Sequence, residues 1–117
     1  PTSIAMVRAM VDRGPYARFV WTVSPDDHLD HHPSAMAIPR SERWLTTEHA
    51  YLRVERQVTV PLPETRSSVF LIRVYLHRVD AYSDEQRRIL REALACMPED
   101  VRVYKGLPEL PSIAHLL

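Results

Sequence analysis

Two segments of strict alternation constrain the fold of this chain more than any other feature. Residues 50–60 read AYLRVERQVTV, and residues 69–79 read VFLIRVYLHRV. Apolar side chains recur there at every second position, with Arg56 as the exception, and this period is typical of β-strands. The connection between them contains Pro61 and Pro63. Its length suits a hairpin between antiparallel neighbours.

The remaining elements follow from shorter patterns. Residues 4–11 have the spacing of a short amphipathic helix, which Gly14-Pro15 ends, and the β-branched and aromatic run 18–23 predicts a strand. Ser83, with Gln86 three residues later, predicts a capping box at the start of a long helix. Residues 101–104 (VRVY) predict a further strand, and the tail predicts a short helix. Antiparallel strands with flanking helices make an α+β domain.

Composition limits the class of protein. The chain has 117 residues, of which 45% are hydrophobic, so we expect one compact domain over residues 1–117. Its 15 basic and 15 acidic side chains argue against a nucleic-acid-binding protein. Cys96 is the single cysteine, and there is no 18-residue apolar run, so neither an internal disulfide nor a membrane span is expected. A soluble cytoplasmic protein is the default expectation.

A loop rich in aspartate and histidine is the first candidate site. Residues 24–43 lose all periodicity, contain three prolines, and include DDHLDHH at 26–32. His28 and His32 are four residues apart, as zinc-binding histidines on one helix face can be, but the prolines favour a loop. Three interpretations stay open: a solvated polar loop, a metal site, or contact with a cofactor or partner.

The polar side chains of the predicted hairpin are the second candidate. We expect Arg53, Glu55 and Gln57 on one strand to share a face with Arg73, Tyr75 and His77 on the next. Such a face is either solvated, with cross-strand ion pairs that contribute little, or it faces a ligand. In the second case Glu55 could hold a cationic amine and an arginine could hold an acidic group.

Four blocks in order give the chain a family resemblance. They are LRVERQ at 52–57, LPET at 62–65, VFLIRVY at 69–75 and YKGL at 104–107, and Trp21 matches an earlier Asn-Trp element. Together they resemble the haem-dependent oxidative N-demethylase family, which includes the α subunit of dimethylamine monooxygenase. The resemblance spans roughly residues 18–107.

The resemblance implies a PAS-like antiparallel sheet that binds haem b, an iron cofactor, against its surface. It implies an oxidoreductase, a monooxygenase that demethylates a small secondary amine with O2. Electrons would come from a flavin and iron–sulfur reductase partner. The family's chains are far longer, so the resemblance covers a C-terminal portion. We therefore expect either part of a longer haem-binding domain or a small relative that a second chain completes.

The resemblance also carries residue roles. Glu55 and Tyr75 become the candidate catalytic residues, with Glu55 orienting the cationic substrate. The candidate cofactor-binding residues are Arg53, Arg56, Gln57 and Arg73. The axial ligand of the haem iron stays open among His28, His31, His32, His49 and His77.

Some positions depart from the family pattern. Val20 stands where the family has asparagine before the tryptophan, and Leu71 and Val74 replace two threonines. The added apolar character favours an alternative, a subunit that stabilises a partner and has lost the cofactor. A non-enzymatic PAS-like module that binds a small molecule or haem is a further alternative. The arginines and Glu55 favour the enzyme.

Overall fold

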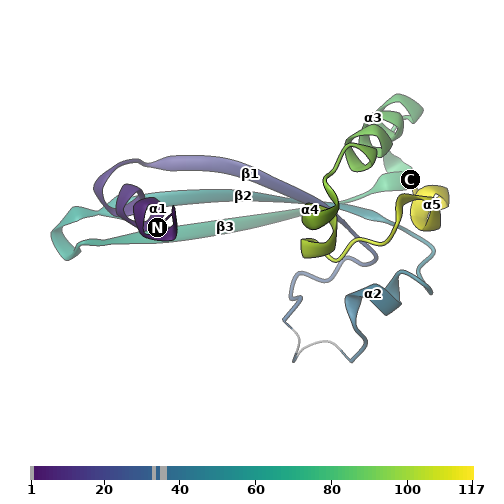
Figure 1. The fold of residues 1–117 in the computed structure, drawn as a ribbon, viewed down its shortest axis with the longest axis horizontal. Helices are drawn as coiled ribbons and strands as arrows, with labels where there is room; N and C mark the ends of the chain where they lie inside the picture. Colours follow the sequence, from purple (N-terminus) through teal and green to yellow (C-terminus); the bar gives the residue numbers. More distant parts are fainter. Residues whose placement is uncertain (1, 33, 35–36) are drawn as a thin grey trace. The chain divides into compact units, whose positions relative to one another are not determined.

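A computed structural model describes residues 2–32, 34 and 37–117, and it confirms an α+β fold (Figure 1). Three antiparallel strands form one sheet in the order β1-β2-β3. The elements are α1 (Thr2–Asp12), β1 (Tyr16–Ser24), α2 (Arg40–Arg43), β2 (Tyr51–Leu62), β3 (Ser67–Arg78), α3 (Asp84–Ala95), α4 (Glu99–Tyr104) and α5 (Leu110–Ile113). Short 3-10 turns include η2 (Pro63–Thr65), η3 (Val79–Ala81) and η4 (Ala114–Leu116). The PAS-like form of the sheet stays a prediction.

The chain divides into two compact units. Unit 1 contains residues up to 21 together with 54–75, and unit 2 contains 22–53 together with 76–117. Each strand of the sheet contributes residues to both units. Unit 1 is therefore α1 with most of the hairpin, whereas unit 2 holds the Asp/His loop and the other helices.

In unit 1, helix α1 covers one face of the sheet, and the other face is open. Helix α1 crosses the strands (Figure 1) and covers Gln57 and Thr59, which are 8% and 7% exposed. Phe19 and Leu71 lie on the opposite face by strand alternation and are 67% and 54% exposed. The covered face is thus the more polar one in β2, and the open face is the more apolar one.

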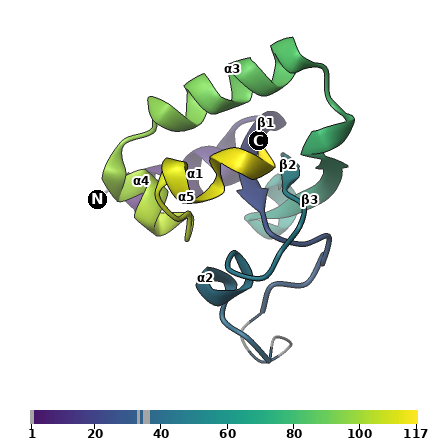
Figure 2. The same ribbon diagram turned by 90° about the vertical axis from the view of Figure 1, so that its right-hand side faces the viewer.

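Unit 2 holds the hydrophobic core. The buried apolar residues of the described chain all belong to it: Val23, Trp44, Ala50, Val79, Leu90, Leu94, Leu107, Ile113 and Leu117. Helix α3 contacts α5, and Figure 2 shows these two helices together with α4. The Val79 N–H donates to the Ala50 carbonyl at 2.9 Å, which closes the base of the hairpin inside this core.

The predicted strand at 101–104 is wrong, because these residues belong to helix α4. Pro98 precedes the helix, and Glu99 and Asp100 occupy its first turn, where negative charge interacts favourably with the helix dipole. The alternation of VRVY is only four residues long. Such a short pattern is easily outweighed by signals at the helix start.

The predicted capping box at the start of α3 is confirmed. The Ser83 hydroxyl accepts from the Gln86 N–H at 3.3 Å, and the Gln86 side chain accepts from the Ser83 N–H at 2.9 Å. Loss of such a cap costs about 0.5–2 kcal/mol. We expect Ser83→Ala to lower the melting temperature by several degrees, with Ser112→Ala as a control in a helix that has no side-chain cap. An unchanged melting temperature in Ser83→Ala would contradict this role.

Two exposed ion pairs, one just before α3 and one within it, make the stability of the fold depend on pH. The Arg78 guanidinium, hydrogen-bonded to Asp80, holds the pKa of that carboxyl below its usual value, and Arg88 does the same for Glu85. Carboxyls with lowered pKa stabilise the fold above their unfolded pKa of about 4, and this contribution is lost as pH falls through the folded pKa. We expect acid unfolding to begin below about pH 4, measured by circular dichroism against pH. In Asp80→Asn, stability should fall less steeply as the pH is lowered. Equal acid profiles would contradict the contribution of Asp80.

No helix among the described residues is long and apolar enough to cross a membrane.

Candidate functional site

A chain of hydrogen bonds in unit 1 links Arg18, Gln57 and Glu55. The Arg18 Nε–H donates to Gln57 Oε1 at 2.7 Å, and Gln57 Nε2 donates to Glu55 Oε2 at 3.0 Å. Arg18 comes from β1, whereas Gln57 and Glu55 are two residues apart on β2 and therefore face the same way. Three side chains from two strands thus form one continuous polar arrangement.

The donors and acceptors of the three side chains fix the orientation of the Gln57 amide. A guanidinium can only donate, so Arg18 fixes the Gln57 oxygen toward itself and turns the Gln57 amide nitrogen toward Glu55. That nitrogen can only donate, so it needs an acceptor, and an ionised carboxylate is the strongest one available. Since Gln57 is buried, its amide cannot easily turn to water instead.

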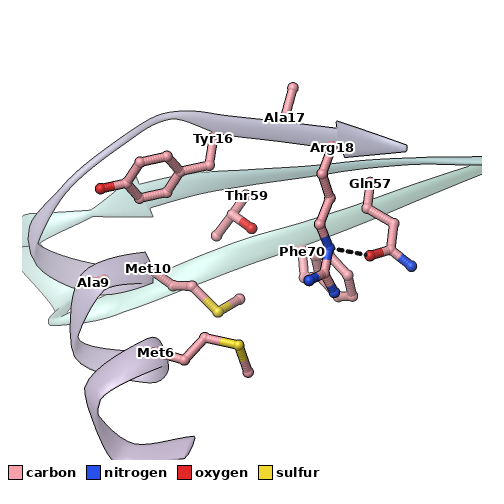
Figure 3. A pocket seen from close by; sticks show the side chains of 9 residues that line it. All are labelled: Met6, Ala9, Met10, Tyr16, Ala17, Arg18, Gln57, Thr59 and Phe70. Atoms are coloured by element: carbon pink, nitrogen blue, oxygen red, sulfur yellow. Dashed lines mark hydrogen bonds between the residues drawn. The ribbon is translucent and has the colours of Figure 1, made fainter. Parts of the chain in front are cut away.

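An apolar pocket lies next to this arrangement (Figure 3). Its volume is about 320 Å³. It is enclosed by α1 on one side and by the sheet on the other, and its lining residues are Met6, Ala9, Met10, Tyr16, Ala17, Arg18, Gln57, Thr59 and Phe70. An apolar cavity with a few polar groups at its wall is the usual form of a small-molecule site.

Arg18 and the pocket were not among the residues predicted from the sequence. Arg18 belongs to the strand predicted from residues 18–23. The sequence of that strand does not show which face of the sheet Arg18 lies on or which residues it contacts. The methionines belong to the predicted first helix, whose contact with the sheet is a tertiary feature. Alternation in β1 could have placed Tyr16 and Arg18 on one face, but not opposite Gln57.

Arg73 and Tyr75 do not share a face with Glu55 and Gln57, so that part of the predicted polar face is wrong. Phe70 lines the pocket beside Gln57, and alternation along β3 then places Arg73 and Tyr75 on the opposite side. There the Arg73 guanidinium lies 5.3 Å from the centre of the Tyr75 ring, a cation–π contact. Alternation along β2 puts the exposed Arg56 on this open face as well.

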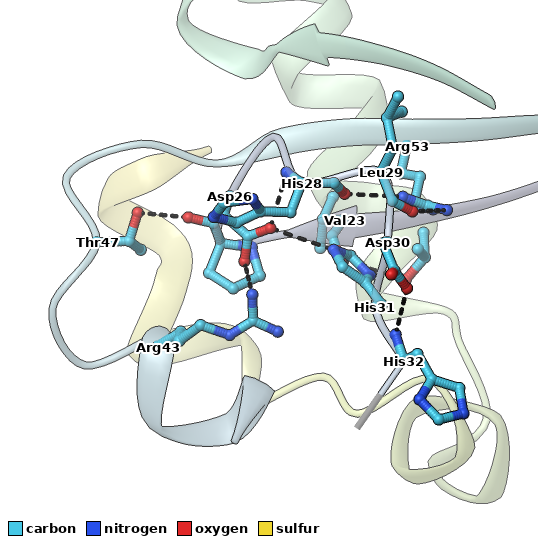
Figure 4. Close-up of polar contacts among 12 residues, drawn as sticks. Val23, Asp26, His28, Leu29, Asp30, His31, His32, Arg43, Thr47 and Arg53 are labelled. Carbon is cyan, nitrogen blue, oxygen red and sulfur yellow. Dashed lines mark hydrogen bonds and ion pairs between the residues drawn. The ribbon is translucent and has the colours of Figure 1, made fainter. Parts of the chain in front are cut away.

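The Asp/His loop of unit 2 is held together by Asp26 (Figure 4). One carboxylate oxygen of Asp26 is 3.1 Å from His31 Nε2, and the other pairs with Arg43. The guanidinium of Arg53 donates to the carbonyls of His28 and Leu29 at 3.2 Å each. Arg53, predicted to contact a cofactor, thus fixes the backbone of the loop.

The other candidate ligand histidines are dispersed within unit 2. His32 Nδ1 lies 2.7 Å from the Ser34 hydroxyl, and His49 lies 3.4 Å from Asp80. The ring of His77 is 6.4 Å from that of Tyr82. Over the part of the chain that the structure describes, no three His, Cys, Asp or Glu side chains are grouped as metal ligands.

Among the described residues, the side chains that could ligate iron do not form a haem site within either unit. A haem iron needs an axial ligand such as histidine, thiolate, thioether or phenolate beside an apolar cavity. All six histidines belong to unit 2, whereas the apolar pocket belongs to unit 1. That pocket, with Met6 and Met10 in its wall, is at the small end of the about 300–1,000 Å³ range of ligand sites and has no room for a porphyrin. Among the described residues, neither unit combines a histidine with an apolar pocket large enough for haem.

A family model described as haem-dependent oxidative N-demethylase, alpha subunit-like, matches residues 4–114. No curated protein and no solved structure matches the chain significantly. The matched region includes both the polar arrangement around Gln57 and the pocket. The chain therefore belongs to the family of haem-dependent oxidative N-demethylase alpha subunit-like proteins.

Proposed function

We propose that this chain binds a small secondary amine as part of a haem-dependent oxidative N-demethylase, with Glu55 as the residue that holds the substrate ammonium. The observation that carries the proposal is the hydrogen-bond chain from Arg18 through Gln57 to Glu55. Family membership supplies the reaction class.

The chemistry of the amine supports this role for Glu55. A secondary amine is protonated near neutral pH, so its recognition requires a carboxylate that stays ionised. Gln57 donates to Glu55, and Arg18 adds a positive charge at the far end of the same amide. Gln57, which donates to Glu55, also lines the apolar pocket.

The overall reaction needs reactants that the chain does not supply. Oxidative demethylation converts an N-methyl group to N–H and formaldehyde, placing one oxygen atom of O2 in formaldehyde and the other in water. It consumes two electrons and two protons, which agrees with a reductase partner of the flavin and iron–sulfur type. Haem b would supply oxygen activation. Arg56 and Arg73, exposed on the open face, are the proposed contacts for acidic groups of the cofactor, whereas Tyr75 lies on that face and away from an amine at Glu55.

A hemin titration of the purified chain tests the cofactor part of this proposal. A Soret band that saturates at one equivalent and that one His→Ala variant abolishes would establish haem binding and name the ligand. The series comprises His28, His31, His32, His49 and His77, with His115→Ala as the control. A featureless spectrum from folded protein would show that the chain alone does not bind haem, and the titration would then be repeated with a candidate second chain.

The open face of unit 1 favours a second function, in which the chain stabilises a partner without turnover. Phe19 and Leu71 expose apolar surface there, and Leu71 is one of the positions that depart from the family pattern toward apolar character. Exposed apolar patches commonly mark interaction surfaces. Amine binding that depends on Glu55 separates the two functions, because a purely stabilising subunit does not need it.

A further inference from the structure

We propose that the amine bound by this chain also carries a carboxylate, so that the substrate class is an N-methylated α-amino acid and Arg18 is the residue that selects it. This inference rests on the proposed function, because it takes Glu55 as the site of the ammonium. It adds a second charged contact that dimethylamine cannot make.

The spacing of the two charges supports a zwitterionic ligand. Arg18 and Glu55 contact opposite ends of one amide, through hydrogen bonds of 2.7 and 3.0 Å. The Arg18 Nε and the Glu55 carboxylate oxygen are therefore at most about 8 Å apart. The ammonium and carboxylate of an α-amino acid are separated by one carbon atom. With a hydrogen bond at each end, such a molecule spans about the same distance.

Arg18 has the properties of a carboxylate-binding side chain. It is exposed at the pocket wall, and Gln57 uses only one of the five N–H donors of a guanidinium. The planar guanidinium can bind both oxygens of a carboxylate at once. Gln57 and the sheet hold its position, so little side-chain freedom is lost when the ligand binds.

The pocket limits the size and polarity of the rest of the ligand. Met6 and Met10 from α1 and Phe70 from β3 form an apolar wall beside Arg18 (Figure 3). Flexible thioethers adapt to small apolar groups. With about 320 Å³ available beside Arg18, the pocket accepts a short aliphatic side chain but not a peptide. The ligand class is therefore a free, small, N-methylated amino acid.

Calorimetric titration of the full chain tests this inference without any cofactor. The probes are N-methylglycine, N-methylalanine and dimethylammonium, added to wild type, Arg18→Met, Arg18→Lys and Arg8→Met. Arg8 is the matched control, because it belongs to α1 and does not line the pocket. We expect the N-methylated amino acids to bind wild type at least tenfold more tightly than dimethylammonium. Arg18→Met should abolish this preference, Arg18→Lys should restore part of it, and Arg8→Met should keep it.

Two outcomes overturn the inference in different ways. If dimethylammonium binds wild type as tightly as N-methylglycine and Glu55→Gln weakens both, the role of Arg18 is wrong and the amine site stands. If none of the probes binds folded wild type, amine recognition at Glu55 is wrong and the inference falls with it. The comparison between ligands on wild type needs no variant, so misfolding of Arg18→Met cannot hide the answer.

Discussion

Replacing Glu55 with glutamine is expected to weaken the binding of dimethylammonium by about 10- to 100-fold while the fold stays intact. A hydrogen bond to a charged group contributes about 1.5–3 kcal/mol, and each 1.4 kcal/mol corresponds to a factor of ten in affinity. Glutamine has nearly the same shape and keeps an oxygen that can accept from Gln57. The change therefore removes the negative charge and preserves the hydrogen-bond chain.

Affinity and melting temperature must be measured together for this variant. The matched control is Glu64→Gln in η2, an exposed glutamate of the same unit that does not line the pocket. It should bind dimethylammonium as wild type does. Equal affinities in Glu55→Gln and wild type would contradict the role of Glu55. A melting temperature lowered by several degrees in Glu55→Gln alone would identify Glu55 as a structural residue.

Local patterns predicted most of the secondary structure. The two alternating segments became β2 and β3, and the helix after Ser83 became α3 with the expected capping box. These patterns are long, or they include a specific end signal, so they depend little on tertiary contacts. The segment at 101–104 has four residues, and Pro98 with its following acidic turn decided its conformation as a helix.

The arrangement of the site depended on information that local patterns do not contain. Alternation correctly groups Glu55 with Gln57 on one side of β2, but it does not say which side of β3 meets them. That depends on the register across the hairpin, and a shift of one residue reverses the faces. In the structure, Gln57 and Phe70 both line the pocket. Tyr75 therefore lies on the opposite face of the sheet from Glu55.

The face of the sheet that α1 covers could not be predicted from the sequence either. Val54, Val58 and Val60 suggest a core on their side of β2, whereas α1 covers the side of Gln57 and Thr59. The buried polar groups are tolerated because Gln57 both accepts and donates a hydrogen bond. A polar surface beneath an apolar helix is a suitable place for a small charged ligand, and alternation alone does not distinguish it from a solvated face.

Leu94→Ala is expected to have the largest effect on stability, lowering the free energy of unfolding of unit 2 by about 2–5 kcal/mol. Leu94 is 6% exposed on α3, within the unit that holds all the buried apolar residues of the described chain. Folded domains are stable by only about 5–15 kcal/mol in total, so this loss is a large fraction. Urea unfolding followed by tryptophan fluorescence measures it, because Trp44 is buried in the same unit.

Ile89→Ala supplies the matched control on the same helix. Ile89 is 53% exposed, so its truncation leaves little cavity and should cost less than about 1 kcal/mol. Equal losses in the two variants would contradict the assignment of the core to the side of α3 that carries Leu94.

Because the Arg18–Gln57–Glu55 chain lies entirely in unit 1, hydrogen exchange at the Gln57 amide shows whether unit 2 supports the site. If exchange at Gln57 rises together with unfolding of unit 2, the sheet that both units share transmits the loss, and ligand affinity should fall with it.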